Sequence, residues 1–202
     1  AALVYDAFYK MVEAEDELKE LAKKRRSDIY LEETNTTIKP IAFNAKKSDG
    51  FNPQLVICDE MAAWSGDGGL KQYEVMKSAL GARRQPMILS ISTAGYINDS
   101  IYDELMKRST SFLKGSSKEH RLLPFLYIID DVEKWNDITE LKKANPNMGV
   151  SVQEGFFKDE IAVAEGSLSK KAEFLTKYCN IKQNSSVAWL EYTLVDKASE
   201  ES

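Results

Sequence analysis

The stretch Leu55-Val56-Ile57-Cys58-Asp59-Glu60 decides the fold of this chain, because an apolar run ends in two adjacent carboxylates. An apolar run without alternation is typical of a strand buried on both faces, as in a parallel sheet. Open α/β sheets bind ligands at the carboxyl ends of such strands. There Asp59 can hold a hydrated Mg²⁺ while Glu60 orients the attacking water, which is the arrangement of a Walker B strand. The alternative is that strands often end in acidic residues where the chain regains solvent.

A second apolar run, from Pro86 to Gly95, turns small and hydroxylated at its end, where Ser92 and Thr93 lie. The residues between the two runs, 70 to 80, predict a helix. A strand, a helix and a strand at this spacing form one βαβ unit, which sets both strand ends at one edge of a sheet. We therefore expect the two hydroxyls beside Glu60, where they could sense a γ-phosphate or the attacking water. Small residues could also simply ease a tight strand exit.

Further motifs accompany these two runs in a fixed order. They are Asp49-Gly50-Phe51-Asn52-Pro53, Trp64, Gly81-Ala82-Arg83-Arg84-Gln85-Pro86, the stretch from Lys143 to Val152, the stretch from Phe174 to Lys177, and Trp189-Leu190. In this order the chain resembles the large terminase subunit of tailed bacteriophages, the ATPase and nuclease that drives DNA into a preformed capsid. The resemblance covers most of the chain, from about Tyr5 to Leu190.

The resemblance implies an α/β domain of the P-loop NTPase (ASCE) type, with a mainly parallel sheet flanked by helices and a helix-rich C-terminal part. It implies that Asp59 coordinates Mg²⁺, that Glu60 is the general base acting on ATP, and that Ser92-Thr93-Ala94 is the coupling motif that links hydrolysis to DNA movement. The implied partners are double-stranded DNA, the small terminase subunit, the portal protein and further copies in a ring. The implied location is the cytoplasm of a bacterial host, without membrane contact, for a phage- or prophage-encoded protein.

Two parts of the family pattern are missing from this sequence. No stretch reads Gly-x-x-x-x-Gly-Lys-Ser/Thr, so the phosphate-binding P-loop, which in the family precedes the helix resembling residues 2 to 25, is absent. We expect residues 1–185 to form a partial ATPase domain without this Walker A segment. We expect residues 186–202 to begin a linker towards a nuclease domain that the chain lacks. Such a fragment should be inactive alone.

The cation that should act on a neighbouring subunit's nucleotide is not assigned by the sequence. Asp49 occupies the position where many relatives carry an arginine, and a carboxylate cannot stabilise phosphoryl charge. Lys46 and Lys47 lie close by and could take that task, although a lysine pair in a loop is more often just solvated. Arg83 and Arg84 could face DNA, a subunit or nucleotide.

Composition restricts the remaining classes of protein. The 202 residues include 27 Lys and Arg against 32 Asp and Glu, a net charge of −5, which argues against a permanent DNA-binding face because clustered cations supply most non-specific affinity. No apolar stretch approaches the ~20 residues needed to cross a bilayer. Cys58 and Cys179 give no disulfide framework and fit a reducing compartment. His120 is the only histidine, which excludes a histidine-rich metal site, and we expect it on a surface loop.

The other segments predict an α/β domain with a helical tail. Residues 2 to 25 predict one amphipathic helix or two joined near Ala14, and residues 29 to 31 and 36 to 43 predict a hairpin. The glycine-rich residues 65 to 69 predict a flexible connector or a mobile gate. A further strand is expected from Leu122 to Ile129, and further helices at 99–114, 137–144, 153–165 and 168–179.

Three alternatives stay open. The run from Phe125 to Ile129 also ends in two carboxylates, Asp130 and Asp131, and could hold the metal instead, although the polar residues that follow are typical of an exposed turn. A metal-dependent nuclease that uses Asp59, Glu60 and Asp130 would also need only clustered carboxylates and Mg²⁺, and it would cut DNA without ATP. The third alternative is a non-catalytic interaction fragment.

Overall fold

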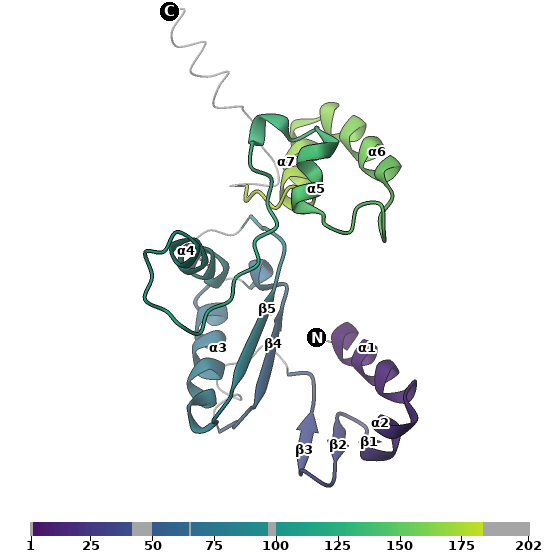
Figure 1. Ribbon diagram of the computed structural model, residues 1–202, viewed down its shortest axis with the longest axis vertical. Coiled ribbons are helices and arrows are strands. Elements are labelled where there is room, and N and C mark those ends of the chain that lie inside the picture. Colours follow the sequence, from purple (N-terminus) through teal and green to yellow (C-terminus); the bar gives the residue numbers. More distant parts are fainter. Residues whose placement is uncertain (1, 42–49, 65, 97–99, 184–202) are drawn as a thin grey trace, which may run out of the picture. The chain divides into compact units, whose positions relative to one another are not determined.

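The computed structural model describes residues 2–41, 50–64, 66–96 and 100–183 of the chain (Figure 1). The chain forms two compact units, residues 1–47 and 48–202, and each is described by itself. The predictions for Lys46, Lys47, Asp49 and Trp189-Leu190 lie outside the described residues.

The first unit combines two short helices with a small antiparallel sheet. Its elements are α1 (Ala2–Glu13), α2 (Asp16–Leu21), β1 (Ala22–Lys24), β2 (Ile29–Leu31) and β3 (Thr36–Ile38), with the strands in the order β1-β2-β3. Two helices joined near Ala14 are thereby confirmed, but a helix that continues to residue 25 is wrong. Lys23 and Lys24 pair instead with Tyr30 and Ile29 as an edge strand, a position that suits lysine because its charge prevents further strand pairing.

The predicted hairpin is confirmed in β2 and β3, although β3 ends at Ile38 rather than near residue 43. Asn35 in the connecting turn adopts the left-handed conformation, with φ of 49°. Asparagine is one of the few residue types that accept this conformation readily, because its short polar side chain can hydrogen-bond locally. The turn therefore has a residue that fits its backbone.

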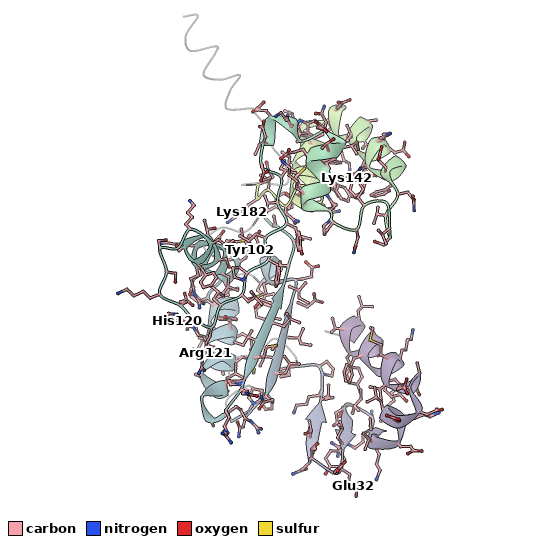
Figure 2. All side chains as sticks on the ribbon, in the orientation of Figure 1. Glu32, Tyr102, His120, Arg121, Lys142 and Lys182 are labelled. Carbon is pink, nitrogen blue, oxygen red and sulfur yellow. The ribbon has the colours of Figure 1, made fainter. Side chains whose placement is uncertain are left out.

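The second unit begins with an α/β part and ends in a helical part. Its elements are β4 (Leu55–Asp59), the 3₁₀ turn η2 (Met61–Ala63), α3 (Gly66–Ala79), the 3₁₀ turn η3 (Leu80–Ala82), β5 (Met87–Ile91), α4 (Ile101–Leu113), the 3₁₀ turn η4 (Val132–Lys134), α5 (Ile138–Ala144), α6 (Glu154–Glu165) and α7 (Leu168–Lys177). All the helices predicted for this unit are confirmed within a few residues. Among the described helices, none is both long enough and apolar enough to cross a bilayer. His120 lies exposed outside these elements, as expected (Figure 2).

Strands β4 and β5 are parallel neighbours, as the βαβ spacing predicts, and they pair from Leu55 with Met87 to Asp59 with Ile91. The expected burial of both faces is wrong for the described residues. Helices α3 and α4 cover one face (Figure 1), where Cys58 packs in a cluster with Tyr73 and other core residues. The other face stays open, with exposed fractions of 44% to 60%; its apolar side chains are Leu55, Ile57, Met87, Leu89 and Ile91. An extended parallel sheet of the P-loop NTPase type stays a prediction, because the described sheet has two strands.

The expectation of a glycine-rich connector at residues 65 to 69 is also wrong for the described residues. Residues 66 to 69 form the first turn of α3 instead of a loop, and Ser65 lies outside the described residues. A Cβ atom on Gly69 would lie 3.0 Å from both the Cβ and the carbonyl oxygen of Trp64. Glycine is therefore required here for the close approach of helix and tryptophan, rather than for mobility.

The helical part has its own core, formed around α5, α6 and α7. Trp135 and Phe174 meet edge to face with ring centroids 5.5 Å apart, and Leu141 and Cys179 are fully buried beside them. This core holds the last described residues, 178 to 183, in place after α7. Residue Gln183 of that segment contacts the α/β part, because its amide donates a hydrogen bond to the carbonyl oxygen of Gly95.

Candidate functional site

The carboxyl ends of β4 and β5 bring the predicted site residues to one edge of the sheet. Asp59 pairs with Ile91, so Glu60 and Ser92 are the next residue on each strand. Thr93 follows as an exposed residue, and Asp59 is half-buried. The structure thus places all four residues of the predicted site at adjacent strand ends.

Glu60 begins the turn after β4 in a strained conformation. Its φ of 52° and ψ of 47° lie in the left-handed region, and its carbonyl oxygen accepts a hydrogen bond of 2.9 Å from the Ala63 amide. For a residue with a side chain this conformation costs about 1–2 kcal/mol. Such strain persists where the surrounding structure imposes it, and it concentrates at functional sites. The exposed Glu60 carboxylate has no hydrogen bond or ion pair with another described residue.

Ser92 joins the end of β5 to the turn that follows β4. Its Oγ accepts a hydrogen bond of 2.9 Å from the Ala62 amide and donates one of 2.8 Å to the Thr93 carbonyl. A Cβ atom on Gly95 would lie only 2.9 Å from the Cβ of Ala62. The two strand exits therefore touch through Ser92, Ala62 and Gly95. Ala62 contributes only its backbone amide to the hydrogen bond, and no residue type reveals such a contribution.

The base of this turn is fixed by buried groups. The indole nitrogen of Trp64 donates a hydrogen bond of 3.1 Å to the carbonyl oxygen of Asp59. Cys58, directly before Asp59, is almost fully buried, and burial raises the pKa of its thiol to about 11. A thiol with such a pKa stays protonated and unreactive at neutral pH. Cys58 is therefore a core residue, and the chemistry of the site falls to the carboxylates and hydroxyls.

The resemblance described above implies Mg²⁺ and ATP, and the donor atoms present fit the metal in kind. Asp59 and Glu60 offer hard carboxylate oxygens at a strand end, which are the ligands Mg²⁺ prefers. Within the described ranges, no group of three or more His, Cys, Asp or Glu side chains could hold a metal ion. Mg²⁺ in nucleotide sites is commonly held by one or two carboxylates together with substrate phosphates. Asp59 thus fits as one ligand of a shared site.

The rival carboxylates Asp130 and Asp131 have structural partners. Asp130 forms an ion pair of 2.8 Å with Lys143, while Asp131 caps η4 through the Glu133 amide. Both of their backbone amides donate to one carboxylate oxygen of Glu140, at 2.5 and 3.0 Å. The expectation of a strand in the preceding run, residues 122 to 129, is wrong, because that run forms no strand in the described part of the chain.

The three carboxylates proposed for a nuclease site, Asp59, Glu60 and Asp130, do not form a metal-binding group in the described structure.

Arg83 has a structural contact at the other end of the sheet. Its guanidinium donates to the carbonyl oxygen of Asn52, from Nε at 3.1 Å and from Nη2 at 2.5 Å. Asn52 and Arg83 both precede their strands, so this contact lies at the amino ends of β4 and β5, away from Glu60.

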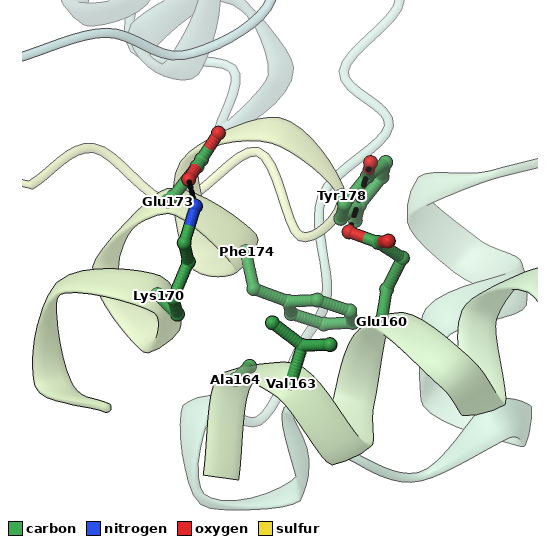
Figure 3. A pocket seen from close by; sticks show the side chains of 7 residues that line it. All are labelled: Glu160, Val163, Ala164, Lys170, Glu173, Phe174 and Tyr178. Carbon is green, nitrogen blue, oxygen red and sulfur yellow. Dashed lines mark hydrogen bonds and ion pairs between the residues drawn. The ribbon is translucent and has the colours of Figure 1, made fainter. Parts of the chain in front are cut away.

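A small hollow lies elsewhere, between α6 and α7 (Figure 3). Its rim carries an ion pair of 3.0 Å between Lys170 and Glu173, and a hydrogen bond of 3.4 Å from the Tyr178 hydroxyl to Glu160. Phe174 lines it between these two polar pairs. The polar groups are thus already paired with one another, and none of the predicted site residues lines this hollow.

Comparisons with known proteins identify the family of this chain. Residues 1–111 match the family model of the terminase large subunit, ATPase domain, and residues 118–201 match that of the terminase large subunit, endonuclease domain. The chain therefore belongs to the terminase large subunit family. The expectation that no nuclease part is present is corrected by the second match. A domain border at residue 185 stays a prediction.

Two individual relatives are similar to this chain. Protein YmfN of Escherichia coli (strain K12) is 34% identical over 137 residues, which is 67% of this chain and 29% of YmfN. The crystal structure of the HK97 bacteriophage large terminase has a similar fold, with a TM-score of 0.74 and 19% identity over 90% of this chain and 37% of that one. The chain thus spans less than two fifths of the length of either relative.

Proposed function

We propose that this chain is part of the ATP-hydrolysing motor of a phage or prophage terminase large subunit that moves DNA into procapsids. The supporting observation is the pair of parallel strand ends, where Asp59 and Glu60 lie next to Ser92 and Thr93. Family membership supports the class of reaction, and the strand-end geometry supports the proposed site for it. The partners would be double-stranded DNA, the small terminase subunit, the portal protein and further copies of the subunit, in the cytoplasm of a bacterial host.

In this proposal the two carboxylates have separate tasks. Asp59 holds Mg²⁺, which when bound with ATP neutralises charge on the phosphates. Glu60 accepts a proton from the attacking water. Its left-handed backbone fixes the start of the side chain, and the hydrogen bond from Ala62 to Ser92 keeps the following turn beside β5. Little rearrangement would then be needed when the nucleotide binds.

The neighbouring hydroxyls differ in what they are free to do. Ser92 already uses its hydroxyl in two hydrogen bonds. The exposed Thr93 makes no side-chain hydrogen bond with another described residue. Thr93 is therefore the better candidate for the coupling contact with the phosphate or the water, whereas Ser92 joins the two strand exits.

Substitutions in the intact subunit test these roles. Glu60→Gln should lower ATP turnover by roughly 10²- to 10⁴-fold with little change in nucleotide binding, because only the proton acceptor is removed. Asp59→Asn should also weaken Mg²⁺-dependent binding. Thr93→Ala should still bind ATP yet lose DNA movement. Glu20→Gln, on the exposed surface of α2, is the matched control and should hydrolyse normally. Near-normal single-turnover hydrolysis by Glu60→Gln would remove Glu60 from the catalytic role.

The 202-residue chain itself should bind Mg-ATP poorly, because the sequence contains no phosphate loop. Isothermal titration of this chain with Mg-ATP measures the affinity directly. Micromolar affinity would show that the phosphates bind to residues other than those proposed.

Metal-dependent DNA cleavage is the second candidate function, and the match of residues 118–201 to the endonuclease domain favours it. Asp130 is ion-paired with Lys143 and belongs to no group of three or more potential metal ligands among the described residues. In the intact subunit, Asp130→Asn should therefore leave Mg²⁺-dependent cleavage of plasmid DNA unchanged. Loss of cleavage in this variant would show that Asp130 is needed for the nuclease activity.

A further inference from the structure

Three segments that are distant in the sequence meet beside the end of β5. They are the exit of that strand at residues 92–95, the extended segment at 127–129, and the segment at 179–183 that follows α7. Cys179 accepts a backbone hydrogen bond of 3.4 Å from Ile129, and the Gln183 amide donates one of 3.3 Å to the carbonyl oxygen of Gly95. The last segment is thereby tied both to the strand exit and to the extended segment.

Asn180 connects all three segments with one side chain. Its Oδ1 accepts a hydrogen bond of 3.3 Å from the Ala94 amide, and its Nδ2 donates one of 2.8 Å to the carbonyl oxygen of Tyr127. The contact needs an acceptor and a donor on one short side chain, which an amide provides. The backbone at Asn180 is left-handed, with φ of 54°. Asparagine accepts this conformation better than most residues.

Neighbouring contacts hold Asn180 in this position. Cys179 before it is fully buried in the core of the helical part. Lys182 after it forms an ion pair of 2.5 Å with Asp103 in the first turn of α4 (Figure 2). Asp103 also accepts from the Ser100 amide and so completes the capping box of that helix. The segment around Asn180 is therefore anchored to both the α/β part and the helical part.

The strand exit thus has attachments at two places. At Ser92 it is bonded to the turn that carries Glu60, through the Ala62 amide. At Ala94 and Gly95 it is bonded to Asn180 and Gln183. A displacement of the turn after β4 must move this short segment, and Asn180 is the side chain that would carry the displacement onward.

We propose that Asn180 is a positioning residue that transmits movement of the coupling segment to residues 118–183, the part that matches the endonuclease model. The proposal rests on the proposed function, since it gives the hydrolysis site a mechanical connection to the rest of the subunit. Asn180 touches neither nucleotide nor water in this scheme. Its loss should therefore separate hydrolysis from DNA movement without abolishing hydrolysis.

The test compares substitutions in the intact subunit. Asn180→Gly keeps a backbone that accepts the left-handed conformation but removes both hydrogen bonds. Asn180→Asp keeps the acceptor for Ala94 and loses the donor to Tyr127. Asn136→Ala is the control, because it removes another asparagine of the helical part, one whose side chain bonds to the exposed Glu165 side chain among the described residues.

Three quantities are measured for each variant: kcat and KM for ATP, base pairs moved per ATP hydrolysed, and hydrogen exchange of the segment around Ala94. For Asn180→Gly we expect kcat and KM within about twofold of the wild type and base pairs per ATP lowered about fivefold or more. Exchange at Ala94 should be about fivefold faster, because its hydrogen bond is lost. Asn180→Asp should show an intermediate effect, and Asn136→Ala none.

The proposal is overturned if base pairs per ATP stay unchanged in Asn180→Gly. A merely structural role would lower hydrolysis and movement together at a constant ratio, and that outcome also overturns it. If the wild-type subunit moves no DNA with ATP, the proposed function fails, while exchange at Ala94 still tests the connection. Unchanged exchange in Asn180→Gly would then show that the connection does not exist.

Discussion

Gly95→Ala tests the contact between the two strand exits. The added Cβ would lie 2.9 Å from the Cβ of Ala62 and 3.1 Å from its carbonyl oxygen, both closer than such atoms normally approach. Ala62 cannot turn aside, because its amide is bonded to Ser92 and its Cβ is fixed to the backbone. The turn must therefore move away from β5. Forcing a methyl group into a packed site costs about 1–3 kcal/mol.

Urea and thermal unfolding of the 202-residue chain measure this cost. The three tryptophans, Trp64, Trp135 and Trp189, all follow residue 48, so their fluorescence reports on the second unit. Each kcal/mol should lower Tm by about 2–4 °C in a unit of this size. Gly81→Ala is the matched control, since a Cβ there meets nothing within 4 Å. It should be neutral or stabilise by up to about 1 kcal/mol. Equal stability of Gly95→Ala and Gly81→Ala would refute the contact.

Three further predictions concern single side chains. Glu60→Gly should stabilise the chain by about 1 kcal/mol relative to Glu60→Ala in urea unfolding, because glycine accepts the left-handed backbone; equal stability would mean that no strain is present. Cys58 and Cys179, whose pKa values burial raises to about 11 and about 12, should resist a thiol reagent at pH 8 until urea unfolds the chain. Glu173 should titrate by NMR with a pKa of about 2 rather than 4.5, because hydrogen bonds from Lys177 and Lys170 favour its charged form. That depressed pKa contributes stability above about pH 4.5 which is lost as the pH falls towards 2, and solvent screening keeps the contribution small; a midpoint near 4.5 would contradict the two ion pairs.

The strand-end geometry could be predicted from the sequence because it depends on local signals. The apolar run to Asp59, the hydroxylated run to Thr93 and a helix-length spacing between them leave few topologies other than a parallel pair. The helices of the second unit follow from their periodicity in the same way. These features depend on residue types and distances along the chain, which the sequence states directly.

The contacts that tie the site together could not be predicted, because they involve backbone atoms. The Ala62 amide on Ser92 and the Ala94 amide on Asn180 depend on how segments pack in space. Any residue except proline would offer the same amide. The apolar run of β4 also does not reveal that one face of the strand stays exposed. Such a run shows that a face can be covered, but not which element covers it. Lys23 and Lys24 have the composition of a helix end but form strand β1. Helix propensity is a weak signal, and pairing with the neighbouring strand overrides it.

The open apolar face of the β4–β5 sheet affects the solubility of this chain and its tendency to self-associate. Its exposed aliphatic side chains attract those of other copies, and a net charge of −5 supplies the opposing repulsion. Warmth and sulfate strengthen the attraction, while acidification removes the repulsion as carboxylates take up protons. Cold, mildly alkaline and sulfate-free solutions therefore keep the molecules dispersed. Warm, acidic solutions rich in sulfate drive them into aggregates.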